Sequence, residues 1–141
     1  MYLYGFKLAN NDYKSLSNAD GVMTIDGSKV VLKPRGSVTN QKWVLVPSGN
    51  NYLLKNVETS QYVVAPSVES TSPEPLVTLT TSETTATQFT PVTVVNRRGR
   101  TYVLRSGNAD ISVKDNLDIV MSKFPATRGA ENNDEWMFTA A

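Results

Sequence analysis

Three aromatic residues recur at a nearly constant spacing, and this recurrence constrains the fold more than any other feature. Trp43, Phe89 and Trp136 lie 46 and 47 residues apart, each within a short segment of alternating apolar residues. A second series keeps a similar period, with an aromatic residue two positions before a leucine: Phe6 and Leu8, Tyr52 and Leu54, Tyr102 and Leu104. Self-similarity at a fixed period is the signature of repeat architectures. The chain is therefore predicted to be one domain of three repeats, spanning about 1–48, 49–97 and 98–141.

The placement of β-favouring residues and turn formers predicts four short strands in each repeat. The first strands are expected at Phe6–Ala9, Tyr52–Asn56 and Tyr102–Arg105, and the second near Lys14–Leu16, Gln61–Ala65 and Asp110–Val113. The third strands are expected at Val30–Leu32, Leu76–Leu79 and Ile119–Met121, and the fourth contain Trp43, Phe89 and Trp136. Helix is expected to be nearly absent, with at most one turn around Ser82–Thr87. Twelve short strands suit a small barrel that closes its own edges, so the predicted class is all-β with pseudo-threefold symmetry.

The composition excludes most routes to catalysis. The 141 residues include neither cysteine nor histidine, which removes thiolate nucleophiles, disulfides, imidazole acid–base chemistry and most catalytic zinc sites. No glycine-rich phosphate-binding motif occurs, and no cofactor or metal is expected. Lysine and arginine number 14 against 13 acidic residues, giving a net charge of +1, and this near-neutrality argues against nucleic acid as a partner. The sequence therefore favours a binding protein over an enzyme.

The amino-terminal segment lacks the features of a targeting sequence. Residues 1–12 contain neither the basic region nor the apolar region of a signal peptide. No later stretch approaches the roughly 18 apolar residues that a spanning helix needs. We therefore expect a soluble, cytoplasmic protein that does not insert into membranes.

Two segments carry a resemblance to a known family. Residues 40–45, with the sequence N-Q-K-W-V-L, are similar to the N-Q-x-W strand of ricin-B-like β-trefoil proteins. Residues 52–63 resemble the Y-x-I-x-N-V-x-T-G-x-Y-L unit of small intracellular trefoils of mushrooms. The full Q-x-W occurs only at Gln41 and Trp43, since the second repeat has Phe89 after Thr87-Gln88 and the third has Asp134 in place of the glutamine. The resemblance implies a β-trefoil lectin of fungal type.

The resemblance also implies which residues would hold a sugar. Family members that bind galactose-type sugars use a carboxylate early in the second strand, an aromatic side chain against the ring, and an amide before the Q-x-W strand. The third repeat matches best, and its candidates are Asp110, Ser112 as the competing acceptor, Phe124, Asn133 and Asp134. These residues predict a glycan or glycoprotein as the partner.

The other two repeats match the sugar-binding pattern less well. The first keeps only Asn40 and Gln41 as weaker candidates, because its acceptor position is expected near Ser15–Ser17. The second has no acid in its matching stretch, Tyr62-Val63-Val64. A trefoil with one site, or with none, is therefore expected in preference to one with three.

A trefoil protease inhibitor is the alternative function, because the same fold hosts both activities. Inhibitors present an exposed loop whose low flexibility limits the entropic cost of binding. Two loops depart from the threefold pattern: the basic tip with Arg97, Arg98 and Arg100, and the proline-rich segment Ala65–Pro75. The partner would then be a protease. A module that binds another protein through a trefoil face, and a homodimer, are also left open.

Overall fold

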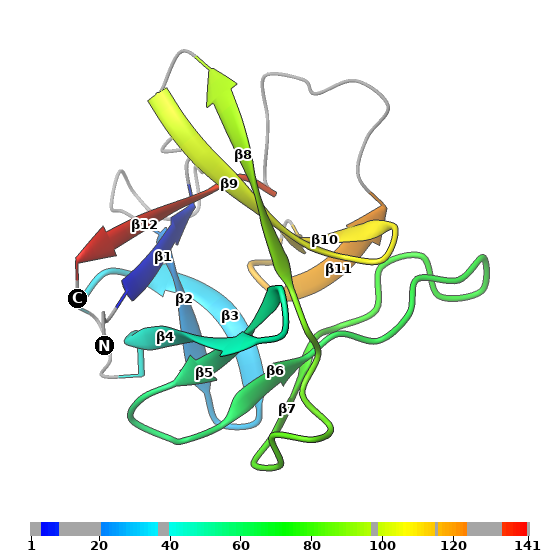
Figure 1. Ribbon diagram of the computed structural model, residues 1–141, viewed down its shortest axis with the longest axis horizontal. Coiled ribbons are helices and arrows are strands. Elements are labelled where there is room, and N and C mark those ends of the chain that lie inside the picture. The colour runs from blue at the N-terminus through cyan, green and yellow to red at the C-terminus, as the bar shows by residue number, and fades with distance from the viewer. Residues whose placement is uncertain are drawn as a thin grey trace.

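The computed structural model describes residues 4–8, 21–36, 40–96, 99–114, 116–123 and 134–140. Twelve strands join one sheet in which every pairing is antiparallel (Figure 1). The strands are β1 Tyr4–Leu8, β2 Gly21–Asp26, β3 Lys29–Pro34, β4 Trp43–Ser48, β5 Asn51–Asn56, β6 Tyr62–Val64, β7 Thr78–Thr80, β8 Thr90–Asn96, β9 Gly99–Ser106, β10 Ala109–Val113, β11 Ile119–Lys123 and β12 Trp136–Ala140. The prediction of an all-β fold with twelve strands is confirmed.

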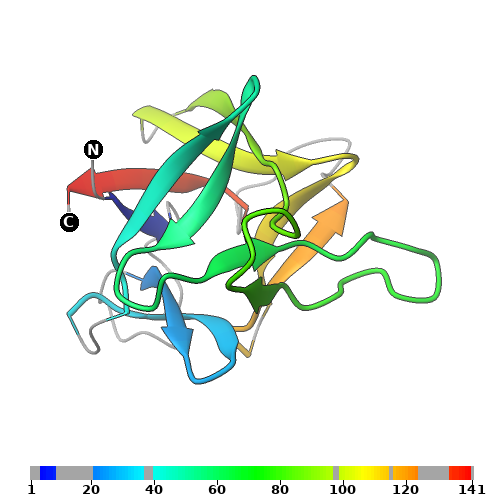
Figure 2. The same cartoon turned by 60° about the horizontal axis from the view of Figure 1, so that its bottom comes forward.

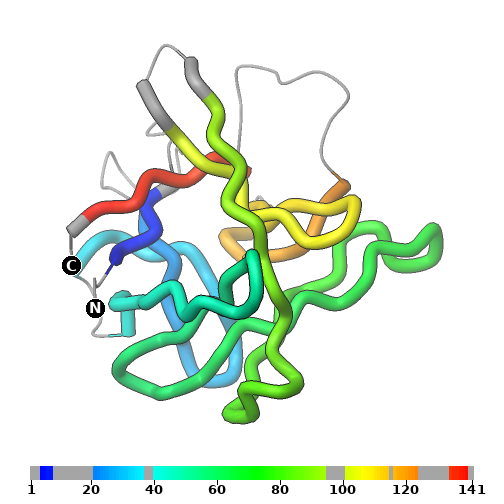
Figure 3. Tube along the Cα trace, in the orientation of Figure 1, coloured from blue at the N-terminus to red at the C-terminus, as the bar shows by residue number. Residues whose placement is uncertain are grey.

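Six of the strands close into a barrel. β1 pairs with β12 and β4, β4 with β5, β8 with β9, and β9 with β12. A bridge between Tyr52 and Phe89 joins β5 to the start of β8 and completes the ring. The remaining strands form three hairpins, β2–β3, β6–β7 and β10–β11, which contact one another through bridges such as Val31 to Asp118 and Leu76 to Val120. Each repeat contributes two strands to the barrel and one hairpin, and the three repeats follow one another along the chain (Figure 3).

The threefold relation is visible in one recurring backbone contact. Tyr4 bridges Trp43, Tyr52 bridges Phe89 and Tyr102 bridges Trp136, so each tyrosine faces the large aromatic residue of its own repeat. Trp43, Phe89 and Trp136 are fully buried in one core cluster. The sequence correctly predicted that these three side chains fill equivalent places in the core.

The second recurring series, an aromatic residue two positions before a leucine, was misaligned in the first repeat by two residues. The register pairs Leu45 with Leu54 in β4–β5 and Phe138 with Phe6 in β12–β1. Phe6 therefore corresponds to Leu54 and Leu104, and all three are fully buried. Tyr4, not Phe6, is the counterpart of Tyr52 and Tyr102. The predicted alignment was wrong because either an aromatic or an aliphatic side chain can fill this buried position.

The second strand of the first repeat also lies elsewhere than predicted. The segment Lys14–Leu16 is outside the described residues, and the strand that pairs with β3 is β2, Gly21–Asp26. Gly21 begins β2, and the turn with a left-handed residue lies at Gly27, whose φ is 63°. The other predicted strands overlap the observed ones, although β7 begins at Thr78 and Phe89 lies just before β8.

Residues 82–87 form turns and no helix. The amide of Thr85 donates to the carbonyl of Ser82 at 3.2 Å and that of Ala86 to Glu83 at 3.4 Å. Every named element in the described part of the chain is a strand. Accordingly, the described ranges hold no helix long and apolar enough to cross a membrane.

The proline-rich segment Ala65–Pro75 projects from the barrel (Figure 2). Its exposure agrees with the prediction, but it folds back on itself instead of staying extended. Glu69 and Ser72 exchange both backbone hydrogen bonds, at 3.1 and 3.0 Å, and so form a small hairpin. The returning arm is tied to the third repeat, since the amide of Met121 donates to the carbonyl of Pro75 at 2.9 Å.

Candidate functional site

The buried tryptophans establish which strand positions correspond between repeats. The indole Nε1 of Trp43 donates to the carbonyl of Met23 at 3.1 Å, and that of Trp136 donates to the carbonyl of Ile111 at 3.2 Å. Met23 and Ile111 are therefore equivalent. The residues before them, Val22 and Asp110, correspond as well, and so do the residues after them, Thr24 and Ser112. The acceptor position of the first repeat is thus Val22 or Thr24, and the prediction near Ser15–Ser17 was wrong.

Asp110 belongs to a buried ion pair. Gly107 and Asn108 form a two-residue turn between β9 and β10, and Gly107 adopts the left-handed φ of 60° that this turn requires. The register that follows places Arg105 opposite Asp110. Arg105 Nε donates to Asp110 Oδ1 at 2.9 Å and Nη2 to Oδ2 at 3.4 Å. The Asp110 side chain is 0% exposed, whereas that of Arg105 is 28% exposed.

Burial raises the pKa of Asp110 above its ordinary value of 3.8. Removing a carboxylate from water disfavours its charged form, and this is the largest influence on the pKa of Asp110, which the hydrogen bond and positive charge of Arg105 oppose. The negative charge of Asp134 and a hydrogen bond between the two carboxyl groups raise the pKa of Asp110 further. Asp110, Arg105 and Asp134 therefore form one electrostatic cluster.

Ser112 and Asp134 are the counterparts of Thr24 and Gln41, which are hydrogen-bonded to each other in the first repeat. Ser112 Oγ donates to the carbonyl of Asp110 at 3.3 Å, as Thr24 Oγ1 donates to that of Val22 at 2.9 Å. Asp134 precedes Trp136 by two residues, as Gln41 precedes Trp43. Ser112 is 6% and Asp134 5% exposed. The threefold relation therefore makes Ser112 the counterpart of Thr24, which bonds Gln41, whereas Asp134 itself hydrogen-bonds with Asp110.

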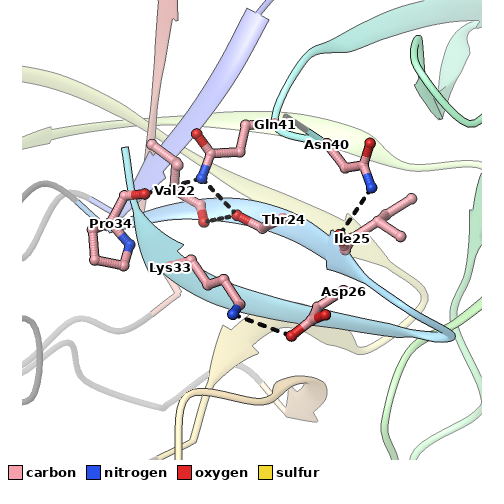
Figure 4. A network of polar contacts seen from close by, with 8 residues as sticks. All are labelled: Val22, Thr24, Ile25, Asp26, Lys33, Pro34, Asn40 and Gln41. Atoms are coloured by element: carbon pink, nitrogen blue, oxygen red, sulfur yellow. Dashed lines mark hydrogen bonds and ion pairs between the residues drawn. The ribbon is translucent and has the colours of Figure 1, made fainter. Parts of the chain in front are cut away.

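The first-repeat candidates are committed to internal hydrogen bonds (Figure 4). Gln41 Nε2 donates to Thr24 Oγ1 at 3.1 Å and to the carbonyl of Pro34 at 3.0 Å. Its Oε1 accepts from the amide of Gly36 at 2.9 Å. Asn40 Nδ2 donates to the carbonyl of Ile25 at 3.4 Å. These bonds fix the β2–β3 hairpin against the chain entering β4, which is a structural role.

The second repeat has no acid at the matching positions. The register of β5 and β6 places Lys55 opposite Tyr62, so Tyr62 is the counterpart of Asp110 and Lys55 that of Arg105. The Lys55 ammonium lies 5.6 Å from the centre of the Tyr62 ring. Thr87, in the Q-x-W position, accepts a hydrogen bond at 2.8 Å from the amide of Ala65. In the first repeat Lys7 lies opposite Val22, so the basic residue at this position has a different partner in each repeat.

Several predicted residues lie outside the described part of the chain. Phe124 and Asn133, the proposed wall and edge of the sugar site, are among them. Arg97 and Arg98 are also outside, and for Arg100 only the backbone, in β9, is described. The strands that flank this basic tip are described, and Asn96 pairs with Gly99.

Two residues that bond the predicted candidates were not predicted, namely Arg105, which pairs with Asp110, and Thr24, which accepts from Gln41. A signal for Arg105 was available, because the Gly107-Asn108 turn places the residues two positions outside it opposite each other. Thr24 was hidden by the misplaced second strand. Within the described ranges, no group of three or more acidic residues is arranged to hold a metal ion.

The family profile described as ricin-type beta-trefoil lectin domain-like matches residues 39–131. No curated protein sequence matches the chain.

Solved structures share the fold at low identity. An endo-β-galactosidase from Clostridium perfringens that releases GlcNAcα1-4Gal aligns over 100% of this chain and 33% of its own, with a TM-score of 0.68 and 18% identity. The ricin B-like lectin of Macrolepiota procera, in complex with lactose, aligns over 99% of this chain and 95% of its own, with a TM-score of 0.65 and 10% identity. The designed threefold-symmetric protein ThreeFoil aligns over 99% of both chains, with a TM-score of 0.59 and 15% identity. The chain therefore has the β-trefoil fold, and it spans about a third of the endo-β-galactosidase.

Proposed function

Because the chain belongs to the family of ricin-type β-trefoil lectin-like domains, we propose that it is a non-catalytic carbohydrate-binding protein with its site in the third repeat. The absence of histidine and cysteine favours binding over catalysis. Galactose-type glycans are the proposed ligands. The lactose complex of the Macrolepiota procera lectin, which shares the fold, supports this choice.

One observation carries the assignment to the third repeat. At the position of Asp110 the other repeats have Val22 and Tyr62, and at the position of Asp134 they have Gln41 and Thr87. Carboxylates at both places occur in the third repeat only, and Asp134 is the one proposed as an acceptor for the sugar, because Asp110 is bonded to Arg105. Sugar hydroxyls need charged or polar acceptors, and hydrogen bonds to charged groups contribute roughly 1.5–3 kcal/mol each. The third repeat is therefore the best equipped of the three.

The proposed residues have different tasks. Ser112 and Asp134 form the polar floor, Phe124 stacks on the apolar face of the sugar ring, and Asn133 closes the polar edge. Asp110 is fully buried and bonded to Arg105, so its task is to hold Arg105 and Asp134 in place. This assignment moves direct contact with the sugar from Asp110 to its competitor Ser112.

A glycan array probed with the unmodified protein tests the proposed function. We expect retention on β-galactosides and no binding to matched glycans that lack a terminal or internal galactose. Binding confined to unrelated glycans would overturn the galactose assignment. A protein that binds no glycan on the array, at concentrations near 10 µM that detect weak lectins, would overturn carbohydrate binding itself.

The projecting Ala65–Pro75 hairpin supports a second candidate, inhibition of a protease. Its tip is exposed, and its base is anchored by the bond from Met121 to Pro75. Such preorganisation limits the entropy lost on binding. The Arg97–Arg100 tip is the other inhibitory loop under this proposal. Assays against trypsin and papain, run beside the glycan array, separate the two candidates because each predicts a positive result in one assay only.

A further inference from the structure

A hollow of about 140 Å³ lies between the second and third repeats. One wall is formed by residues 65–68, which follow β6, and the other by the turn from Ser106 to Ala109. Side chains of adjacent residues in a strand point to opposite faces. In the register of β9 and β10, Ser106 lies opposite Ala109, and the neighbouring pair is Arg105 and Asp110. The inter-repeat hollow therefore lies on the face of these two strands opposite to the ion pair.

The connections between the first two strands differ in length among the repeats. The link between the first and second strands spans residues 9–20 in the first repeat and 57–61 in the second, but only Gly107 and Asn108 in the third. The shortest of these three connections is the one that lines the hollow. The start of the Ala65–Pro75 segment borders this space, and the bond from Ala65 N to Thr87 Oγ1 holds it in place. Both segments that border the hollow, the two-residue turn and the start of the proline-rich segment, belong to the second and third repeats.

The lining combines an apolar floor with a polar rim. Ala109 is 3% and Met121 1% exposed, and both belong to the core cluster, against which Val68 also packs. At the rim, Ser67 and Asn108 are exposed. None of the lining residues carries a charge. This lining suits an uncharged ligand that has one apolar face and several hydroxyl groups.

We propose that the inter-repeat hollow binds one neutral pyranose ring. Its ligand class rests on the proposed carbohydrate binding, but its position is independent of Ser112 and Asp134. Pockets for drug-sized ligands occupy roughly 300–1,000 Å³, so a hollow of about 140 Å³ takes a single ring and not an oligosaccharide.

Each part of the lining has a task in this proposal. The carboxamide of Asn108 donates to one ring hydroxyl and accepts from its neighbour, since an amide provides both functions. The Ser67 hydroxyl forms a hydrogen bond with a third hydroxyl of the sugar. The apolar C–H face of the sugar ring covers Val68, which is half-buried, and so removes apolar surface from water.

Amide chemical shifts of the whole ¹⁵N-labelled chain, titrated with the methyl glycosides of galactose, glucose and N-acetylglucosamine, test the proposal. We expect at least one glycoside to shift the amides of Ser67, Gly107 and Asn108. Asn108→Ala should weaken this binding about fivefold or more, and Ser67→Trp should abolish it by covering the opening. Asn50→Ala is the control, because Asn50 is an exposed asparagine in the β4–β5 turn.

The outcomes separate this inference from the proposed function. Shifts at the hollow that persist in Ser112→Ala support a second site. Shifts confined to residues around Ser112 and Asp134 would overturn the inference and leave the proposed function standing. No shift with any glycoside would overturn the inference, and a simultaneous failure on the glycan array would overturn both. An equal loss of binding in Asn50→Ala and Asn108→Ala would also count against the hollow.

Discussion

Arg105 and Asp110 face each other across the turn between β9 and β10, and their side chains form an ion pair of 2.9 Å. The equivalent pairs are Lys7 with Val22 and Lys55 with Tyr62. The third repeat has thus replaced a neutral partner by a buried carboxylate. Such a group needs its partner, because a buried charge without one is costly.

Asp110→Ala should destabilise the fold by about 1–3 kcal/mol, the range for leaving a buried polar group without its partner. A comparison of urea midpoints measures the loss. The control is Asp26→Ala, which removes an ion pair with Lys33 that is largely exposed, at 58% for Asp26. Exposed pairs contribute little. Equal, small losses in both variants would contradict the role of the buried pair.

The stability of the protein should depend on the ionisation of Asp110. Its pKa is raised in the folded state, so the folded chain holds this proton more tightly than the unfolded chain. The contribution of Asp110 to stability is therefore greatest below the ordinary pKa of 3.8 and falls as the pH rises through the folded pKa.

The difference in unfolding free energy between the wild type and Asp110→Asn isolates this effect from other titrating groups. That difference should decline as the pH rises from 3.8 and level off once the folded carboxyl is ionised. A difference that grows over the same interval would mean that the pKa of Asp110 is lowered. Urea titrations at a series of pH values provide the measurement.

Ser60→Gly should stabilise the protein by about 0.5–1 kcal/mol. Ser60 has a φ of 59°, a left-handed conformation that costs residues other than glycine roughly 1–2 kcal/mol, offset in part by the greater freedom of glycine when unfolded. In the resembling trefoil unit this position is glycine. The reverse change at Gly49, with φ of 61°, is the control. Gly49→Ser should lower the thermal midpoint, and a lower midpoint for Ser60→Gly would contradict the strain.

Trp43→Ala should cost about 3–5 kcal/mol, because it leaves a cavity in the core and removes the bond to Met23. Trp43→Phe should cost less, since Phe89 fills the equivalent place in the second repeat. Chemical denaturation of both variants measures the difference. Equal costs would mean that ring volume does not determine stability at this position.

Residue spacing predicted much of the fold because burial recurs with the repeat. Trp43, Phe89 and Trp136 must each fill the core, so their period is visible without a structure. The second strand of the first repeat was missed for a physical reason. Asp20-Gly21 and Asp26-Gly27 have the same turn chemistry, but only Gly27 needs a positive φ, and Gly21 begins a strand.

The site was harder to predict than the core. Asp110, Ser112 and Asp134 were identified by resemblance, and the structure places Asp110 and Asp134 in one electrostatic cluster. What the sequence did not reveal is that Asp110 is buried against Arg105, because burial depends on the neighbouring strands. Only the cross-strand register of β9 and β10 makes that pairing evident.

Ser112→Ala and its threefold counterpart Thr24→Ala provide the most direct test of a glycan site in the third repeat. Both changes delete a hydroxyl that donates to the carbonyl two residues earlier, and Thr24→Ala also removes the acceptor of Gln41. A loss of binding caused by lower stability alone should therefore be at least as large in Thr24→Ala. Calorimetric titration with lactose should show binding by the wild type and by Thr24→Ala with similar affinity. Ser112→Ala should bind at least about tenfold more weakly, a difference of 1.4 kcal/mol. Unchanged lactose binding by Ser112→Ala, or an equal loss in Thr24→Ala, would contradict the site.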